Sequence, residues 1–403
     1  MHNGSSLFTG DAGQGESNIR RWLIENDWLE AIVALPLNLF YNTGIATYVW
    51  VLANRKPQHR RGRVQLIDAS QSFKPLRKNL GKKNCELAEE DILHICDAYL
   101  AFQETPQSKI FPNEAFGYWK IAVERPLRLH SQLSSKAIEA LRFASGDEDI
   151  RRTLFDQLGE PLFSDFQSVR PQLETLLHEW GTDEAGSDGD DENAPEKKGL
   201  SEKKKRKLLD PKTWERDARL VETATALRRE LGDNLFEDHN FFCESADAAC
   251  AKLGLKLGSA ELNTILRAVS WRVETAPPVI SKIHKSGKGT NAPKANPLHG
   301  FYQANIAGKT CVVEYKPDSE FRDTEQIPLL ETGGIEAFFR REVLPYTPDA
   351  WIDPAVTKIG YEISFTRHFY QPQPLRSLEE IRKDIAALED ETKGLLSEIV
   401  GAR

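Results

Sequence analysis

An aromatic pair in a polar turn is the feature of this sequence best suited to chemistry. The stretch ALPLNLFYNTGI, residues 34–45, ends an apolar run and sets Phe40 and Tyr41 beside Asn42 and Thr43. Enzymes that act on a base flipped out of a nucleic-acid duplex stack that base against an aromatic wall. The same pattern is typical of a ring that anchors a turn to the core. Taken alone, the residues favour this second interpretation of Phe40.

Other catalytic and metal-binding patterns are absent from the sequence. The nine histidines form no HExxH and no zinc spacing with cysteine, and there is no GxSxG. The glycine-containing stretches at 10–15 and 286–290 lack the full pattern of nucleotide-binding loops, so they indicate ordinary loops. The five cysteines form no CxxC, which predicts reduced thiols and a cytoplasmic location. No run approaches the ~18 apolar residues of a membrane helix.

Charge is distributed unevenly along the 403 residues. The net charge is −8, yet residues 54–83 carry ten basic residues and one acidic residue. Residues 275–313 carry five lysines and no acidic residue. This segregation is typical of a subunit that contacts DNA, and equally of a basic face that is only solvated.

The elements that must position the aromatic turn alternate between helix and strand. Residues 15–26 predict a helix with Ile19, Trp22 and Leu23 on its apolar face. Apolar and β-branched runs then predict strands at 28–35, 45–53 and 64–68. These elements suit the edge of a larger α/β sheet and are too few for a complete doubly wound domain.

The rest of the chain reads mainly as helices. We predict helices over 88–102, 131–180, 211–272 and 333–344, a strand within 116–129, and a hairpin at 299–316 that turns at Ala307–Gly308. The intervening segment 181–210 is expected to be a charged flexible linker, because its first part has almost no apolar residues. The KKKRK that follows it fits a solvated helix start better than a targeting signal. Core candidates in the helical part are Leu133, Ile138, Leu141, Leu154 and Leu158.

The last helix has the most regular pattern. Ser377 and Glu380 predict a capping box at its start. Apolar residues then recur at alternating spacings of three and four, with Thr392 as a polar interruption. The stripe is narrow, which favours packing against other helices, either of this chain or of a partner. Its members include Ile381, Ile385, Leu388, Leu395 and Ile399.

Long stretches of the sequence resemble one protein family. Residues 3–52 are similar to the later half of the catalytic domain in the modification (M) subunits of type I restriction-modification systems. Those subunits are adenine-specific DNA methyltransferases of the N-6 type that use S-adenosyl-L-methionine (AdoMet). Further stretches that resemble the same family are 108–129, 269–302, 318–345, 358–370 and 377–400.

The resemblance implies a fold and a division of the chain. Residues 1–70 would be the C-terminal portion of a Rossmann-like AdoMet methyltransferase sheet. Residues 71–180 would be a mixed, mainly helical extension, and 211–370 a region of helices and small β-hairpins. The coiled-coil-like helix at 377–400 would dock on a partner.

Two motifs expected of the family are missing. The sequence has no glycine-rich AdoMet-binding turn and no NPPF-type tetrapeptide, and its closest string is APPV at 276–279. We therefore expect an M subunit that is truncated, that is read from a wrong start, or that is one half of a split enzyme, and that methylates adenine only when complete. AdoMet would be the cofactor of that complete enzyme, and this chain alone is expected to bind neither AdoMet nor a metal and to be inactive. The alternative is a non-catalytic DNA-binding or assembly module of the restriction complex.

Site residues and partners follow from the same resemblance. The target-base pocket would contain Phe40, Tyr41, Asn42 and Thr43, and the apolar stripe of the last helix would bind the specificity (S) subunit. Other expected partners are DNA, the restriction (R) subunit and a second M subunit or the missing upstream half, with no membrane involved. Contacts with the DNA backbone would come from Arg60, Arg61, Arg63, Lys78, Lys82, Lys285, Lys288 and Lys294.

Overall fold

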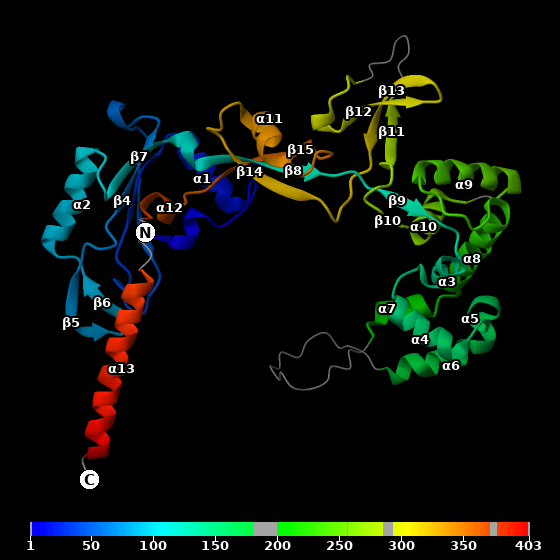
Figure 1. Cartoon of the computed structure of the whole chain (residues 1–403), viewed down its shortest axis with the longest axis horizontal. Coiled ribbons are helices and arrows are strands. Elements are labelled where there is room, and N and C mark those ends of the chain that lie inside the picture. The colour runs from blue at the N-terminus through cyan, green and yellow to red at the C-terminus, as the bar shows by residue number, and fades with distance from the viewer. Residues whose placement is uncertain (1, 181–199, 256, 285–292, 371–376, 402–403) are drawn as a thin grey trace. The chain divides into compact units, whose positions relative to one another are not determined.

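A computed structural model describes residues 2–180, 200–255, 257–284, 293–370 and 377–401. The chain forms two compact units (Figure 1). The first, here the sheet unit, comprises Met1–Ile121, Glu325–Phe338 and Thr357–Arg403. The second, here the helical unit, comprises Ala122–Thr324 and Phe339–Val356.

A five-stranded sheet organises the sheet unit. The three predicted strands are confirmed as β2 (Leu29–Ala34), β3 (Thr47–Leu52) and β4 (Arg63–Asp68). β1 (His2–Asn3) and β7 (Ser108–Pro112) are the edges, in the order β1-β3-β2-β4-β7. β2 and β4 are parallel, and the other neighbours are antiparallel. This is a mixed α/β sheet, which agrees with the predicted class.

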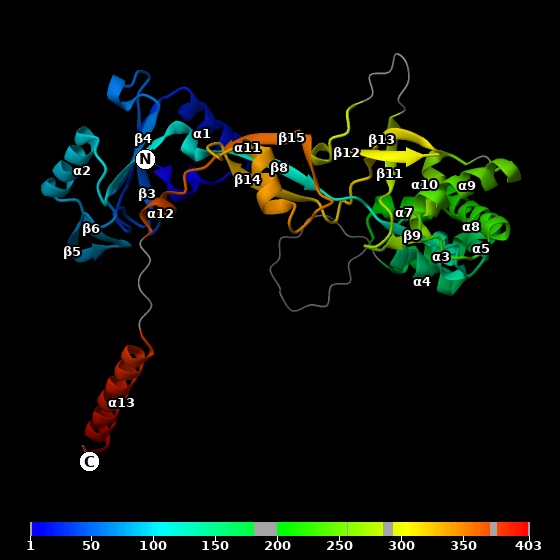
Figure 2. The ribbon, with the colours of Figure 1, turned by 45° about the horizontal axis from the view of Figure 1, so that its top comes forward.

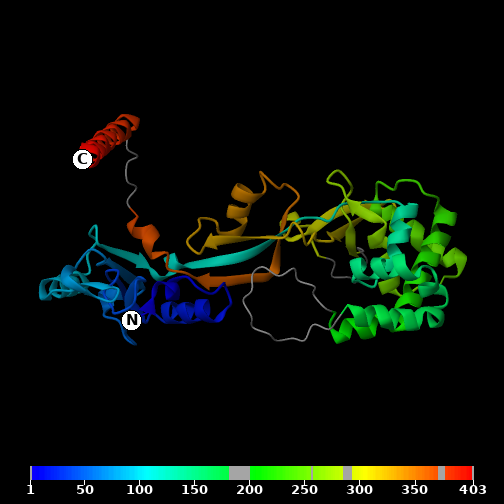
Figure 3. The same cartoon turned by 90° about the horizontal axis from the view of Figure 1, so that it is seen from below.

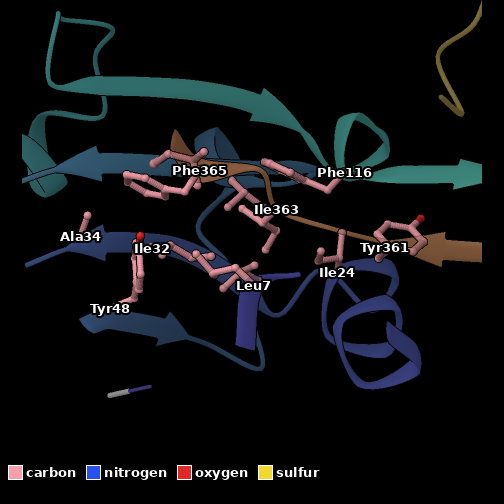
Figure 4. Close-up of a cluster of buried hydrophobic side chains, with 12 residues drawn as sticks. Leu7, Ile24, Ile32, Ala34, Tyr48, Phe116, Tyr361, Ile363 and Phe365 are labelled. Atoms are coloured by element: carbon pink, nitrogen blue, oxygen red, sulfur yellow. The ribbon is translucent and has the colours of Figure 1, made fainter. Parts of the chain in front are cut away.

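One face of this sheet is closed by residues from distant parts of the chain (Figure 4). Ile32 and Tyr48 of the sheet pack with Leu7, and the Tyr48 ring lies 5.2 Å from that of Phe365. Phe365 begins α12 (Phe365–Phe369), which follows the long strand β15 (Trp351–Tyr361). The core of the sheet unit therefore depends on residues near the C-terminal end of the sequence.

The first helix buries a different face from the one predicted. α1 (Gly15–Glu25) forms where expected, but Ser17, Arg20 and Ile24 are its buried residues, while Ile19 and Trp22 are exposed. The prediction of Ile19 and Trp22 as the packing face is therefore wrong. The reason is that the Arg20 guanidinium donates to four main-chain carbonyls, with distances of 2.7 Å to Tyr361, 3.1 Å to Ser6, 2.7 Å to Thr9 and 3.4 Å to Gly10.

The opposite face of the sheet carries α2 (Glu89–Ala101). Ile95 and Tyr99 of this helix pack on Val33 and Ile67 of the sheet.

An additional hairpin, β5 (Lys74–Leu80) and β6 (Lys83–Glu86), lies beside α2 (Figure 2). This hairpin was not predicted from the sequence. A separate sheet, β14-β8-β15, adds β8 (Gly117–Glu124) and β14 (Asp323–Pro328).

Helices make up most of the helical unit (Figure 3). Four of the five predicted core leucines and isoleucines are buried, and the fifth, Leu158, is partly buried against the cluster that contains Leu154. The predicted linker lies mostly outside the described residues, but its end forms α7 (Glu202–Leu208), which contains KKKRK. The other helices are α3 (Ser135–Ala140), α4 (Glu148–Leu158), α5 (Pro161–Ser164), α6 (Phe166–Glu179), α8 (Pro211–Leu231), α9 (His239–Leu253) and α10 (Ser259–Ala268).

The short strands of this unit form two small sheets. The predicted hairpin is confirmed as β12 (Phe301–Ile306) and β13 (Lys309–Tyr315), with positive φ at Ala307 and Gly308. β11 (Ile280–His284) pairs with β13 of this hairpin, while β9 (Leu129–Ser131) pairs with β10 (Ser270–Arg272).

The helix predicted at 333–344 is split into α11 (Gly334–Phe338) and a π-helical turn, Phe339–Val343.

A buried histidine should make the stability of the helical unit depend on pH. His239 Nδ1 lies 2.8 Å from Ser131 Oγ, and Nε2 lies 3.3 Å from Cys243 Sγ. Burial lowers the pKa of His239 and raises that of Cys243 to about 11, so both side chains are neutral at pH 7. The unfolded chain takes up a proton near pH 6.5 that the folded chain resists, so the stabilisation is present above pH 6.5 and is lost as pH falls.

We expect the midpoint temperature of unfolding to fall between pH 7 and pH 5, and to fall less in His239→Gln. Circular dichroism melts at several pH values measure this. An equal fall in both proteins would mean that other groups cause it.

Candidate nucleic-acid interface

Two loops of the sheet unit meet at one end of the sheet. β2 and β4 are parallel, with Ala34 opposite Asp68 at their carboxyl ends. The turn at 37–44 follows β2 directly, and the β5–β6 hairpin follows β4. Parallel strands of α/β sheets commonly bind ligands outside their carboxyl ends. Here the fold brings the predicted aromatic turn and part of the basic stretch to this end.

The four predicted base-pocket residues form a tight turn. The Thr43 N–H donates to the Phe40 carbonyl at 3.3 Å, and Asn42 has a φ of 56°. Phe40 is half-buried and packs on the cluster beneath α2, whereas Tyr41 is 67% exposed. Packing of Phe40 fits the anchor interpretation, and Tyr41 presents the accessible ring.

An apolar cavity of about 470 Å³ adjoins Phe40. Valines of β2 and β3 and side chains of α2 line it, including Ile95 and Tyr99. The Tyr99 hydroxyl already donates to Glu30. The cavity therefore offers little that could hydrogen-bond the edge of a base.

The hairpin is fixed against the turn. The Asn84 N–H donates to the Asn38 carbonyl at 3.2 Å, and the Cys85 thiol donates to the Leu37 carbonyl at 3.2 Å. At the hairpin tip, Gly81 has a φ of 61°, and a side chain there would collide with Asn42. Glycine is thus required both by the backbone and by the close approach to the turn.

The hairpin carries five basic residues and one acidic residue, Glu86, which lies opposite Lys74 in the strand pairing. Its basic residues project to solvent, and among the described residues none of them forms an ion pair with a carboxylate. Such a surface attracts phosphates and releases their counterions. The residues are Lys74, Arg77, Lys78 and Lys82, which are exposed, and Lys83, which is half-exposed.

The remaining predicted phosphate contacts do not gather here. Arg60 is 3% exposed, its guanidinium stacks 4.1 Å from the Tyr99 ring centre, and it donates to Gln65. The prediction of Arg60 as a backbone contact is wrong, because the group is enclosed by its own partners. Arg61 and Arg63 are exposed but lie at the amino end of β4, opposite the hairpin.

The second basic stretch belongs to the helical unit. Lys294 is exposed, and Lys285 and Lys288 lie outside the described residues. The hairpin was not predicted from the sequence, although Gly81, with basic and polar residues on both sides, was a visible signal of an exposed turn.

A second cavity, of about 420 Å³, lies between the turn and the base of the hairpin. No charged side chain lines it, and none lines the apolar cavity. AdoMet carries an ammonium and a sulfonium cation, and neither cavity is lined by a carboxylate that could pair with them, so neither cavity fits AdoMet. Within the described residues no group of three or more His, Cys, Asp and Glu could hold a metal ion. The second cavity is lined by Leu37, Asn38, Ser70, Gln71, Phe73, Pro75 and Asn84.

The terminal helix presents its stripe to solvent where side chains are described. α13 (Leu378–Gly401) has the predicted capping box, with distances of 3.2 Å from Glu380 N to Ser377 Oγ and 2.9 Å from Ser377 N to Glu380 Oε2. Ile381, Ile385 and Leu388 are 39%, 53% and 61% exposed. The side chains of Leu395 and Ile399 lie outside the described ones. Among the described helices, none is long and apolar enough to cross a membrane.

Comparison with known proteins bears on the first part of the chain. Residues 1–115 match the N-6 DNA Methylase family, a range that includes the turn and the hairpin. The type I restriction enzyme MjaIX methylase subunit of Methanocaldococcus jannaschii is 37% identical over 112 residues, or 28% of this chain and 19% of that protein. The type I restriction enzyme MpnII methylase subunit of Mycoplasma pneumoniae is 34% identical over 89 residues, which are 22% of this chain and 15% of that protein.

A solved structure is also similar. It is the type I restriction-modification system methyltransferase subunit from Streptococcus thermophilus, with 27% identity, coverage of 28% of this chain and 22% of that one, and a TM-score of 0.24. The chain spans only about a fifth of the length of the curated relatives it matches. The resemblance to type I methylase subunits is confirmed for the N-terminal part.

Proposed function

We propose that this chain is part of a type I restriction-modification DNA methyltransferase, which transfers a methyl group from AdoMet to the exocyclic amine of adenine. The contribution proposed for its sheet unit is to hold DNA beside the target base. The observation that carries this is the basic hairpin fixed against the aromatic turn, within the residues that match N-6 DNA methylases. In this role Tyr41 and its neighbours face the base, and Phe40 holds the turn in place.

The methyl transfer itself requires parts that these residues do not provide. The glycine-rich turn and the NPPF-type motif are absent from the sequence, and the described cavities do not fit AdoMet. A DNA-binding or assembly module without catalysis is therefore the second candidate. Calorimetric titration separates the two when the chain is mixed with a segment of an M subunit that carries the glycine-rich turn and the NPPF-type motif, with that segment alone as the reference. Saturable AdoMet binding by the mixture supports the enzyme, and its absence favours the module.

Removing two hairpin lysines should weaken DNA binding. Lys78→Ala with Lys82→Ala deletes two proposed phosphate contacts, so the slope of log K against log salt should become shallower by about 2. Affinity should fall at least about tenfold at low salt. Fluorescence anisotropy with a labelled duplex measures both quantities.

Arg61→Ala with Arg63→Ala is the matched control, since it removes the same charge at the opposite end of β4. It should leave affinity nearly unchanged. If both double variants weaken binding equally, the hairpin is not the interface and only overall charge matters.

We further propose that the α13 stripe binds helices of the S subunit. The exposure of Ile381, Ile385 and Leu388 supports this, because an apolar seam left in water favours association. Assembly with the R subunit and a second M subunit would follow from that complex.

A further inference from the structure

We infer that this chain forms a symmetric dimer in which the α2 helices of two copies pack side by side in antiparallel orientation. The surface concerned is the side of α2 that carries Ile92, Leu93, Cys96 and Leu100, here the α2 face. Their spacing of three and four residues sets them along one side of the helix. No residue of α2 is buried, and Leu93 and Leu100 are 62% and 71% exposed.

The part of the sheet beside α2 is also uncovered. α2 lies over β4, and among the described residues no other helix contributes to the apolar cluster on this side of the sheet. Val49 and Val51 of β3 are therefore only half-buried, and together with Ile92 and Cys96 they line the apolar cavity of about 470 Å³. A continuous apolar surface of this kind is typical of a protein–protein contact.

This cavity suits a packed helix better than a small ligand. Sites for small molecules carry a few polar groups that fix the orientation of the ligand. The lining here is apolar except for the Cys96 thiol and the Tyr99 hydroxyl, and that hydroxyl donates to Glu30. A helix needs no such groups, because its main-chain hydrogen bonds are internal and its apolar side chains make the contact.

The two ends of this surface carry opposite charge. Near the end of α2, the Tyr99 carbonyl accepts from the Arg60 guanidinium, which precedes β4. β3 is antiparallel to β2, and β2 is parallel to β4, so β3 also ends at this edge of the sheet, and the exposed Arg55 follows it. The opposite end of α2 has an acidic first turn, in which Glu89 lies one turn before Leu93 on the same side. Among the described residues, neither Glu89 nor Arg55 forms an ion pair.

These charges favour a second copy in antiparallel orientation. In that arrangement Glu89 of each copy reaches the end of the surface at which Arg55 of the other copy is exposed. In a parallel arrangement the two acidic turns would meet and repel each other. The twofold axis would pass near Cys96, four residues from both Ile92 and Leu100, so the same surface serves both copies.

Sedimentation equilibrium of the full chain tests the dimer, and the expected mass is twice the 45.5 kDa of one copy. Leu93→Gln with Leu100→Gln should raise the dissociation constant at least about tenfold, because two leucines would no longer be buried in the contact. Both side chains are exposed in the single copy, so the fold should be unchanged. His94→Gln with Ala101→Gln places the same side chains at exposed positions off the α2 face and should stay dimeric.

Charge exchange tests the orientation. Glu89→Arg and Arg55→Glu should each weaken the dimer, and the variant with both changes should recover it, because each copy again offers one acid and one base. Glu90→Arg, in the same turn but off the α2 face, should have no effect. A short bismaleimide should link two native copies, and Cys96→Ser should abolish the link.

A mass of one copy at every concentration would overturn the inference. A dimer that survives Leu93→Gln with Leu100→Gln, or charge reversals that do not rescue each other, would overturn it as well. A dimer lost in Ile385→Asp with Leu388→Asp would also overturn it and assign self-association to the α13 stripe.

Discussion

Asp217→Ala should destabilise the helical unit by about 3–5 kcal/mol, the usual cost of leaving a buried charge without its partner. Asp217 and Arg151 are an ion pair with side chains 0% and 1% exposed. Asp217 Oδ1 also accepts a hydrogen bond from the Ser145 hydroxyl at 2.7 Å. The Arg151 guanidinium lies 4.5 Å from the Trp214 ring centre, so water cannot easily replace the lost carboxylate.

Urea unfolding followed by circular dichroism measures this loss as a lower midpoint. Glu148→Ala is the control, because Glu148 pairs with Arg152 on the surface of α4, where both side chains are more than half exposed. Removing such a pair costs about 0.5 kcal/mol or less. A loss below about 1 kcal/mol in Asp217→Ala would show that Arg151 finds another partner or becomes hydrated.

Ile385→Asp with Leu388→Asp should abolish co-purification with the S subunit. The two side chains are neighbours on the exposed stripe of α13, and a carboxylate at each would have to be buried in the proposed helical interface. The sheet and helical units should keep their melting behaviour, because both side chains are exposed in this chain. Co-expression with a tagged S subunit and a pull-down measure the loss.

Ala386→Asp with Ala387→Asp places the same charges on the same turn but off the stripe. This control should still bind the S subunit, which separates loss of the seam from loss of helix propensity. Binding that survives in Ile385→Asp with Leu388→Asp would place the partner surface elsewhere. Global unfolding of that variant would show that the stripe packs within the chain.

The sequence alone determined the elements whose causes are local. Strands β2, β3 and β4 follow from short runs of apolar and β-branched residues, and the α13 cap follows from Ser377 and Glu380 three residues apart. The Ala307–Gly308 turn follows from Gly308, which adopts a positive φ without steric cost, whereas Ala307 takes a positive φ that alanine rarely adopts. The family resemblance also came from the sequence, through the order of its long matches.

Only the tertiary structure decided which polar groups are buried and which loops meet. Arg20 is buried because carbonyls of Ser6, Thr9 and Tyr361 surround it, and the last is 341 residues away in sequence. Arg60 is lost from the basic surface for a similar reason, since Tyr99 and Phe102 enclose it.

The turn and hairpin become one surface because β2 and β4 pair in parallel, which sets their carboxyl ends side by side. Local patterns fix how a segment folds, but the burial of a charge depends on partners that long-range pairing brings to it.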